Sequence, residues 1–386
     1  LRSLSARAGF SGMGHGPTRT KKSQRIEQLL RPFFHAWERY LAVRDDRERR
    51  VLPFDWGTGF LGDGSLSGAE ARAYFHRHAE EALAAHSAYF SPSPVSDFEL
   101  GNDELTFTSP LPTPYPDNNR AHGLFFPTGD CGPAALVLPQ WNAKGGSQTG
   151  LCRLLNRFGL TALRVTLPYH GPRMPEELIR ADYMLSPNLG RTLQACRQAV
   201  WEARSAVTWL LSRGYGPIGI VGTSLGSAIA FITLAHDPRL RAGVMNHVSP
   251  YFADVVWRGI STRHVRQGLE GNIELEELRK LWLPISPQSH YERLLGADKD
   301  VLLVYARYDL SFPPDESRRV VEAFEKLGIL HEKLVLPCGH YTTGKFPFNW
   351  MDGLAISRFL AKSLGSSRSE RESEVVADAE EKATRS

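Results

Sequence analysis

Cysteine is scarce in this chain of 386 residues, and its four copies lie far apart. They form no C-x-x-C pair and have no histidine at metal-ligand spacing, which excludes a disulfide framework and a zinc site. We therefore expect buried free thiols, a reducing, cytoplasmic location and no metal. The four residues are Cys131, Cys152, Cys196 and Cys338.

Long apolar runs and a large net charge are also lacking. The longest runs, Ala134–Leu138 and Val301–Tyr305, fall far short of the roughly 20 residues that span a bilayer, so no integral membrane segment is expected. No apolar stretch of the kind found in secretory signals occurs near residue 1. The 46 lysines and arginines nearly balance the 42 acidic residues and are scattered among them, which argues against a nucleic-acid partner.

The composition is that of a globular protein, with 42% hydrophobic and 10% aromatic residues. Residues 1–24 are rich in Gly, Ser and Arg and are expected to be flexible, and residues 364–386 are expected to form a disordered charged tail. Residues 25–103 open with helical periodicity and predict a helical N-terminal extension. Residues 104–363 alternate strand and helix patterns, and a long helical stretch at about 251–291 predicts a cap inserted between two strands.

Eight short apolar segments predict a mostly parallel sheet with flanking helices, since strands covered on both faces are almost continuously apolar. The segments are Leu105–Thr108, Gly123–Phe126, Ala134–Pro139, Ala162–Leu167, Ile218–Gly222, Ala242–His247, Val301–Ala306 and Glu332–Leu336.

The sharpest motif is G-x-S-x-G at Gly222–Gly226, which follows an apolar strand and precedes a helical pattern. Five such letters occur often by chance, but the flanking strand and helix match a nucleophile elbow. In that turn the serine is held on a strained backbone and both glycines avoid clashes, so Ser224 is the predicted nucleophile.

A serine nucleophile needs a base and an orienting acid, and hydrolases with this elbow supply them later in the chain in the order acid, then histidine. Asp309 follows one predicted strand and His340 follows the next, which places both at the same edge of a parallel sheet. Asp315 and Asp254 are the competing acids. A turn-forming aspartate and a surface histidine are the non-catalytic alternatives for Asp309 and His340.

The oxyanion of acyl transfer also needs donors. One is expected from the backbone N–H of Leu225, and the other from the loop after the third strand, with Trp141 the first choice and Gln140 or Asn142 next. The residues expected to line the pocket, with a purely structural turn as the alternative for two of them, are Gln140, Tyr169, His170 and His247.

From about Leu105 to Leu360 the chain resembles the α/β-hydrolase superfamily. Three segments are similar to a bacterial branch that resembles the eukaryotic α/β-hydrolase domain-containing protein 18: Leu167–Gly171 (LPYHG), Ser186–Gln194 (SPNLGRTLQ) and Gly222–Ser227 (GTSLGS). The resemblance implies a serine hydrolase of carboxylic esters, with a small-molecule or lipid ester as substrate. Pro139-Gln140-Trp141 departs from the usual His-Gly-X of the oxyanion loop.

These patterns together predict ester hydrolysis through an acyl-enzyme, without a cofactor. A peptidase or acyltransferase using the same triad, or a catalytically inactive hydrolase fold that only binds, are the alternatives. The cap is expected to present an apolar underside that favours acyl chains over charged substrates, or else to pack onto flanking helices. Its apolar residues are Phe252, Trp257, Ile260, Val265, Leu269, Ile273, Leu278 and Trp282. The sequence makes no prediction of oligomeric state.

Overall fold

A computed structural model describes residues 21–45, 48–62 and 64–365. The predicted flexible start therefore lies outside the described residues apart from 21–24, and the predicted charged tail lies outside them apart from 364–365. No helix in the described part of the chain is both long and apolar enough to cross a bilayer.

The core is a mostly parallel sheet of nine strands in the order β1-β2-β3-β5-β4-β6-β7-β8-β9. The strands β4 to β9 run parallel to one another, and β1, β2 and β3 form an antiparallel edge against β5. Their bounds are β1 Glu99–Gly101, β2 Glu104–Thr108, β3 Arg120–Phe126, β4 Gly132–Leu138, β5 Thr161–Thr166, β6 Tyr215–Thr223, β7 Leu240–Asn246, β8 Asp300–Ala306 and β9 Glu332–Leu336.

The predicted fold class is thus confirmed, and all eight expected strands are present. The prediction was incomplete at one edge, because β1 is an extra strand of three exposed residues inside the segment assigned to the helical extension. So short a strand carries no periodic signal and is held by its pairing with β2.

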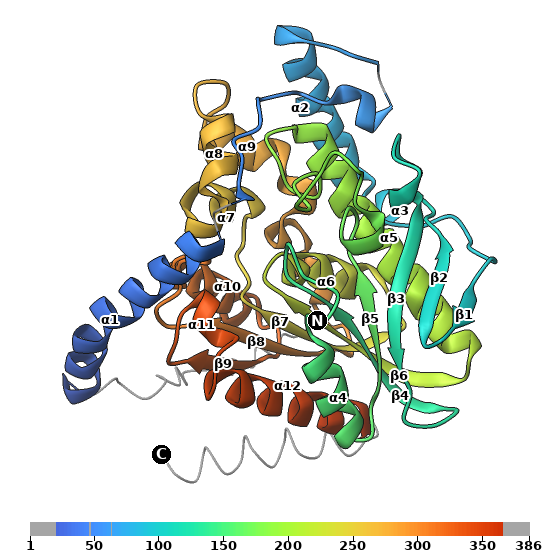
Figure 1. Cartoon of the computed structure of the whole chain (residues 1–386), viewed down its shortest axis with the longest axis vertical. Helices are drawn as coiled ribbons and strands as arrows, with labels where there is room; N and C mark the ends of the chain where they lie inside the picture. Colours follow the sequence, from blue (N-terminus) through green and yellow to red (C-terminus); the bar gives the residue numbers. More distant parts are fainter. Residues whose placement is uncertain (1–20, 46–47, 63, 366–386) are drawn as a thin grey trace, which may run out of the picture.

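Helices cover both faces of the sheet (Figure 1). One face is covered by α5 (Leu189–Ser212), α6 (Leu225–His236) and α10 (Pro314–Leu327), and the other by α4 (Thr149–Arg157) and α12 (Phe348–Gly365). Alternate residues of the strands enter the two cores: Leu136 and Leu138 of β4 face the first set of helices, and Ala135 and Val137 the second. The inner parallel strands are therefore buried on both sides, as their apolar sequences predicted, whereas the edge strand β9 is partly exposed.

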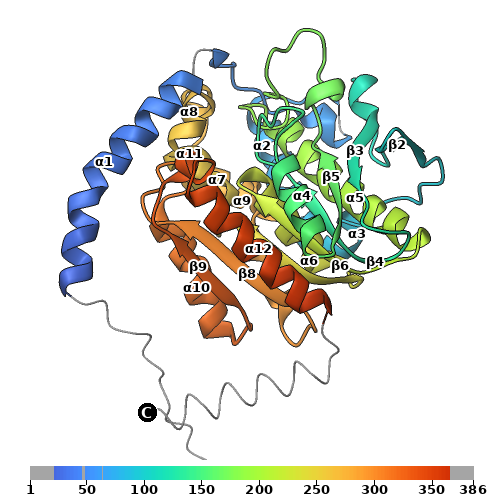
Figure 2. The same cartoon turned by 60° about the horizontal axis from the view of Figure 1, so that its bottom comes forward.

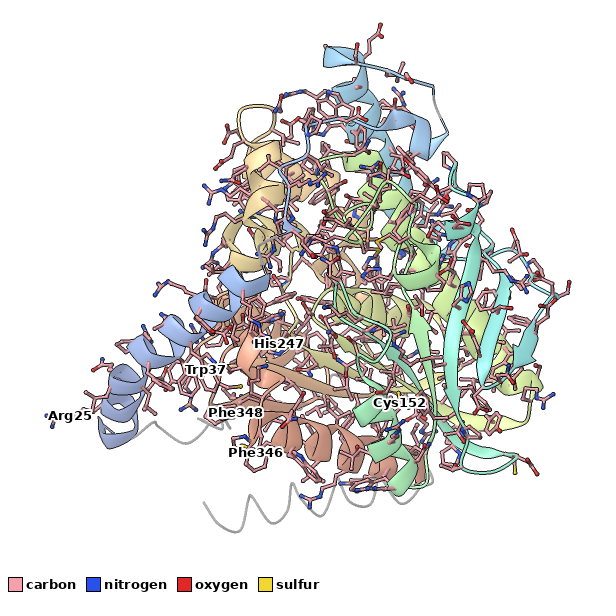
Figure 3. The ribbon with its side chains drawn as sticks, in the orientation of Figure 1. Arg25, Trp37, Cys152, His247, Phe346 and Phe348 are labelled. Atoms are coloured by element: carbon pink, nitrogen blue, oxygen red, sulfur yellow. The ribbon has the colours of Figure 1, made fainter. Side chains whose placement is uncertain are left out.

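The N-terminal extension packs on the sheet domain through helices α1 (Lys21–Asp45), α2 (Gly68–Ala84) and α3 (His86–Tyr89). Figure 2 shows α1 along one side of the molecule. Its Phe34 ring stacks on Tyr308, with centroids 4.7 Å apart, and Trp37 lies on the side of α1 that faces the body (Figure 3). Phe75 of α2 is fully buried in the main core.

The segment after β7, predicted as a cap, contains α7 (Phe252–Arg258), α8 (Arg263–Leu269) and α9 (Leu275–Leu281). Most of the apolar residues expected on its underside pack into the main core: Val265, Leu269, Ile273, Leu278 and Trp282 are all nearly or fully buried there. Phe252 also belongs to that core, and in addition it borders a small pocket beside Ser224.

Candidate active site

Ser224 occupies a strained turn between β6 and α6. Its backbone has φ 56° and ψ −122°, a combination that non-glycine residues rarely adopt. A Cβ on Gly222 would collide with the backbone of Gly226, and one on Gly226 would lie 2.5 Å from the carbonyl oxygen of Leu138. Both glycines are needed because β6, the turn and α6 pack so closely, and the result places Ser224 at the first turn of α6.

Asp309 and His340 are adjacent at the carboxyl ends of β8 and β9. Nδ1 of His340 lies 3.0 Å from Oδ2 of Asp309. The other oxygen, Oδ1, accepts the backbone N–H groups of Ser311 and Phe312, each at 2.7 Å, which fixes the carboxylate. The Phe312 ring stacks on the imidazole of His340 at 5.3 Å and 5°, so that imidazole is held from its face as well as its edge.

Asp309 and His340 shift each other's pKa in the directions that favour the charged forms of both. Burial alone would raise the pKa of Asp309, but the positive charge of His340 and the N–H groups of His247 and His340 hold that pKa well below its usual range. Burial would also lower the pKa of His340, but the carboxylates of Asp309 and Glu38 outweigh it and raise that pKa above its ordinary value. The Asp309 carboxylate therefore stabilises the imidazolium that His340 becomes when it accepts a proton.

The competing acids have other partners. Asp315 is half exposed and pairs with Arg258, with its Oδ2 2.7 Å from the guanidinium. Asp254 is fully buried and accepts hydrogen bonds from Arg279. Among the contacts of the described residues neither acid meets His340, whereas Oδ2 of Asp309 does, so Asp309 is the one of the three predicted acids that pairs with the histidine.

His247 contacts the same aspartate, a relationship that the sequence did not reveal. It follows β7 and lies in the interior of the molecule (Figure 3). Its Nδ1 is 2.9 Å from Oδ2 of Asp309. Its ring centroid is 4.6 Å from that of His340, and its side chain is only 1% exposed. Burial and the charge of His340 lower the pKa of His247, which favours the neutral imidazole beside the carboxylate. Ligand atoms of His247, Asp309 and His340 lie within 4.8 Å of one another, close enough for a metal ion.

Ser224, His247 and His340 all line one cavity. Among the described residues no hydrogen bond joins Ser224 Oγ to His340, and such catalytic bonds often form only when substrate is bound. The hydroxyl of Ser224 and the imidazole of His340 therefore face the same space, in which a reacting carbonyl would bind.

The loop after β4 carries the second expected oxyanion donor. Its Asn142 has a positive φ of 56°. The backbone N–H of Asn142 donates to Nε2 of His170 at 2.8 Å, so this N–H is not free to bind an oxyanion. In the part of the chain that the structure describes, the backbone N–H groups of Trp141 and Leu225 donate no hydrogen bond. Both residues border the small pocket that Ser224 also borders.

The indole of Trp141 anchors this loop. Its Nε1 donates to the carbonyl of Ala181 at 2.9 Å, and its ring stacks on His264. Gln140 lies on the larger cavity, where its side chain accepts a hydrogen bond from Gln148.

Two residues expected to line the pocket are buried beneath it instead. Nδ1 of His170 lies 2.8 Å from the carbonyl oxygen of Pro168, to which it donates, so that Nε2 is the acceptor that holds Asn142. Burial lowers the pKa of His170 to about 4 and keeps it neutral for this role. Tyr169 is fully buried among Tyr115 and Tyr183. Loop position alone could not separate lining from supporting residues.

Glu38 of α1 hydrogen-bonds to the segment that carries His340, although the two lie about three hundred residues apart in the sequence. Its carboxylate accepts the backbone N–H groups of Tyr341 at 3.0 Å and Thr342 at 2.9 Å, at the start of α11 (His340–Thr343). Gly339 is required there because a Cβ would collide with the Glu38 side chain. Burial raises the pKa of Glu38 even though the two backbone donors oppose the shift.

Two cavities meet at Ser224. The larger measures about 970 Å³ and is mostly polar in its lining residues. The smaller measures about 40 Å³ and is mostly apolar, with Leu225, Ala228, Phe252, Val255, Val256 and Phe312 among its walls. The expectation that the site disfavours charged groups fits only the smaller one, because lysines and arginines gather around the larger.

The four cysteines play no part in this site. They are free thiols, as expected, but Cys131 is exposed rather than buried because it lies in the turn before β4.

No family model matches the sequence. The structure is similar to an acetyl xylan esterase from a Paenibacillus species, with a TM-score of 0.55 and 15% identity over 75% of this chain and 94% of that one. It is also similar to acetyl xylan esterase 1 from a Thermoanaerobacterium species, with a TM-score of 0.51 and 16% identity over 81% and 99% of the two chains.

A third similar structure is the acylaminoacyl peptidase of Pyrococcus horikoshii, with a TM-score of 0.52 and 15% identity over 71% of this chain. This chain spans only 43% of that peptidase's length. At such identities the likeness shows the fold, which is that of the α/β-hydrolases.

Proposed function

We propose that this protein is a serine hydrolase that cleaves carboxylic esters through an acyl-enzyme. The observation that carries the proposal is the placement of Ser224 on its strained turn beside the Asp309–His340 pair. Esterases among the similar structures support the same assignment.

In the proposed reaction, His340 takes the proton of Ser224 as Oγ attacks the ester carbonyl carbon. Negative charge moves onto the carbonyl oxygen, which accepts hydrogen bonds from the free N–H groups of Leu225 and Trp141. The tetrahedral intermediate then expels the alcohol, which receives the proton from His340. Water, deprotonated by His340, attacks the acyl-enzyme and releases the acid and Ser224.

The small apolar pocket is assigned to the acyl group. About 10–15 Å³ is enough for one water molecule, so a volume of about 40 Å³ suits an acyl group of a few heavy atoms. We therefore assign a short acyl chain, near the size of acetyl, to the substrate.

A panel of p-nitrophenyl esters of increasing acyl length tests the proposal. The acetyl ester should turn over fastest, Ser224→Ala should abolish turnover, and Asp309→Asn should lower kcat by about two to four orders of magnitude. Asp315→Asn is the matched control, since this exposed acid lies away from the site. EDTA should change nothing, whereas loss of activity with EDTA would indicate a metal at His247, Asp309 and His340 instead.

Aminoacyl p-nitroanilides belong in the same panel because a peptidase is among the similar structures. Cleavage of these amides without any ester turnover would replace the esterase by a peptidase. Transfer of the acetyl group to an added alcohol in preference to water would make the enzyme an acyltransferase. If the folded protein turned over no substrate, the remaining interpretation would be a catalytically inactive hydrolase fold that only binds a ligand.

A further inference from the structure

The larger cavity beside Ser224 is strongly basic. Among the residues that the structure describes, seven lysines and arginines line it, against a single acidic residue, Asp352. The whole chain has 46 basic and 42 acidic residues, so the fold has separated charges that the sequence mixes. The seven are Arg44, Arg49, Lys144, Arg153, Arg157, Arg180 and Lys345.

These cations come from separate parts of the chain. Arg44 belongs to α1, Lys144 to the oxyanion loop, Arg153 and Arg157 to successive turns of α4, and Lys345 follows α11. A solvated charge run would be contiguous in sequence, whereas the fold assembles this group around one cavity. In the described part of the chain, these five make no ion pair, so their charge is available to a ligand.

The single acid of the cavity does not cancel this charge. Burial raises the pKa of Asp352 to about 7, opposed by a hydrogen bond from Asn246, whose Nδ2 lies 2.7 Å from Oδ2 of Asp352. The carboxyl is therefore largely uncharged at slightly acid pH. The remaining polar walls include the amides of Gln140, Gln148 and Asn349, which suit hydroxyl groups.

We propose that the substrate is an ester of an anionic alcohol, bearing phosphate or carboxylate groups, and that this basic cavity binds the alcohol portion. The inference rests on the proposed function, because it assigns the two cavities that meet at Ser224 to the two halves of an ester. The acyl group occupies the small apolar pocket, and the alcohol leaves into the basic cavity. Unpaired cations around a cavity attract anionic ligands from a distance and bind them at low salt.

The first test is binding, which does not depend on catalysis. Inorganic tripolyphosphate is titrated into the Ser224→Ala protein by calorimetry at low salt. The Arg153→Gln/Arg157→Gln variant should bind it roughly three- to tenfold more weakly. The matched control is Arg213→Gln/Lys326→Gln, which removes two exposed cations that precede the amino ends of β6 and β9, away from the cavity at the carboxyl ends. This control should bind tripolyphosphate as tightly as the Ser224→Ala protein does.

The second test is kinetic. Acetate release is measured from acetylglycerol, from acetylglycerol phosphate and from acetylmalate, which separate a neutral, a phosphate-bearing and a carboxylate-bearing alcohol. The wild type should prefer an anionic ester in kcat/KM by roughly tenfold or more at low salt, and the preference should shrink as salt is added. The Arg153→Gln/Arg157→Gln variant should lose the preference, because its kcat/KM for the anionic esters should fall much further than its kcat/KM for acetylglycerol.

The source of the phosphate is tested by comparing soluble acetylglycerol phosphate with 1-O-hexadecyl-2-acetylglycerol phosphate in vesicles, which carries the same acetyl ester on a lipid anchor. Faster turnover of the soluble ester supports a free phosphate ester, and faster turnover of the vesicle lipid supports a headgroup. Equal kcat/KM for neutral and anionic esters, or the same loss in the control variant, would overturn the inference while p-nitrophenyl acetate still reports an active hydrolase. Tripolyphosphate binding without any hydrolase activity would instead overturn the proposed function, and the basic cavity would then be an anion-binding site without an ester substrate.

Discussion

Oδ2 of Asp309 lies 2.9 Å from Nδ1 of His247, and the same oxygen lies 3.0 Å from Nδ1 of His340. Two histidines at the ends of β7 and β9 thus face one carboxylate at the end of β8. His340 is the more exposed of the two, at 13% against 1%, and its higher pKa suits the base that becomes charged. His247 is accordingly assigned as a positioning residue that fixes the carboxylate.

Removing the second histidine should weaken catalysis without abolishing it. His247→Leu should lower kcat by about tenfold and move the acid limb of the kcat/KM profile to higher pH, since the carboxylate then acts on His340 alone. His247→Asn, which keeps an N–H donor near the position of Nδ1, should recover part of the rate. A His247→Leu enzyme as inactive as His340→Ala would mean that His247 is the base.

Glu38 links the N-terminal extension to catalysis. Glu38→Gln should lower kcat several-fold, and it should shift the acid limb to lower pH because the carboxylate helps to raise the pKa of His340. Loss of a buried acceptor should also lower the free energy of unfolding by about 1–3 kcal/mol. Steady-state pH profiles and urea unfolding measure both effects, with the exposed Glu48→Gln as control. An unchanged profile in Glu38→Gln would rule out the electrostatic role.

Asp352 should make stability depend on pH. Its pKa is about 7 in the folded protein and close to 4 when unfolded, so the folded state binds the extra proton between these values. The unfolding free energy of the wild type should therefore fall relative to Asp352→Asn as pH rises from about 4 to 7, and stay lower above pH 7.

The size of this effect follows from the same shift. The difference should reach at most about 4 kcal/mol, since one pKa unit corresponds to about 1.4 kcal/mol. The asparagine keeps an acceptor for the Asn246 side chain, and thermal unfolding at about pH 5 and pH 8 gives the comparison. The same stability difference between the two proteins at about pH 5 and at about pH 8 would show that the carboxyl ionises normally.

The small pocket should set acyl length. Val256 is 1% exposed and forms part of its wall, so Val256→Ala should shift the preferred p-nitrophenyl ester from acetyl toward butyryl. The cost in stability should be about 2 kcal/mol. Val320→Ala removes the same atoms from the core of α10 without touching the pocket, and it should leave the profile unchanged. A profile insensitive to Val256→Ala would move the acyl group elsewhere.

The sequence predicted the strands and the order of Ser224, Asp309 and His340, because apolar runs and strand-end positions are local signals. It placed His247 at the pocket, which it does line, but it could not reveal the contact of His247 with Asp309 or any role of Glu38, since those contacts depend on how α1, β7 and β8 pack. It could not separate the supporting role of His170 from a lining role for the same reason. The basic cavity was also hidden, because its cations are far apart in sequence and meet only in the fold.

Covalent labelling shows directly whether Ser224 is the nucleophile. The wild type is treated with a fluorophosphonate, digested with trypsin and mapped by mass spectrometry. One adduct should appear, on Ser224 in the peptide of residues 214–239, at a rate that falls in His340→Ala. Ser224→Ala should stay unlabelled, while Ser261→Ala, a serine that borders the same two cavities, should keep the label on Ser224. Equal labelling of the wild type and Ser224→Ala, or an adduct on any other residue, would contradict the account.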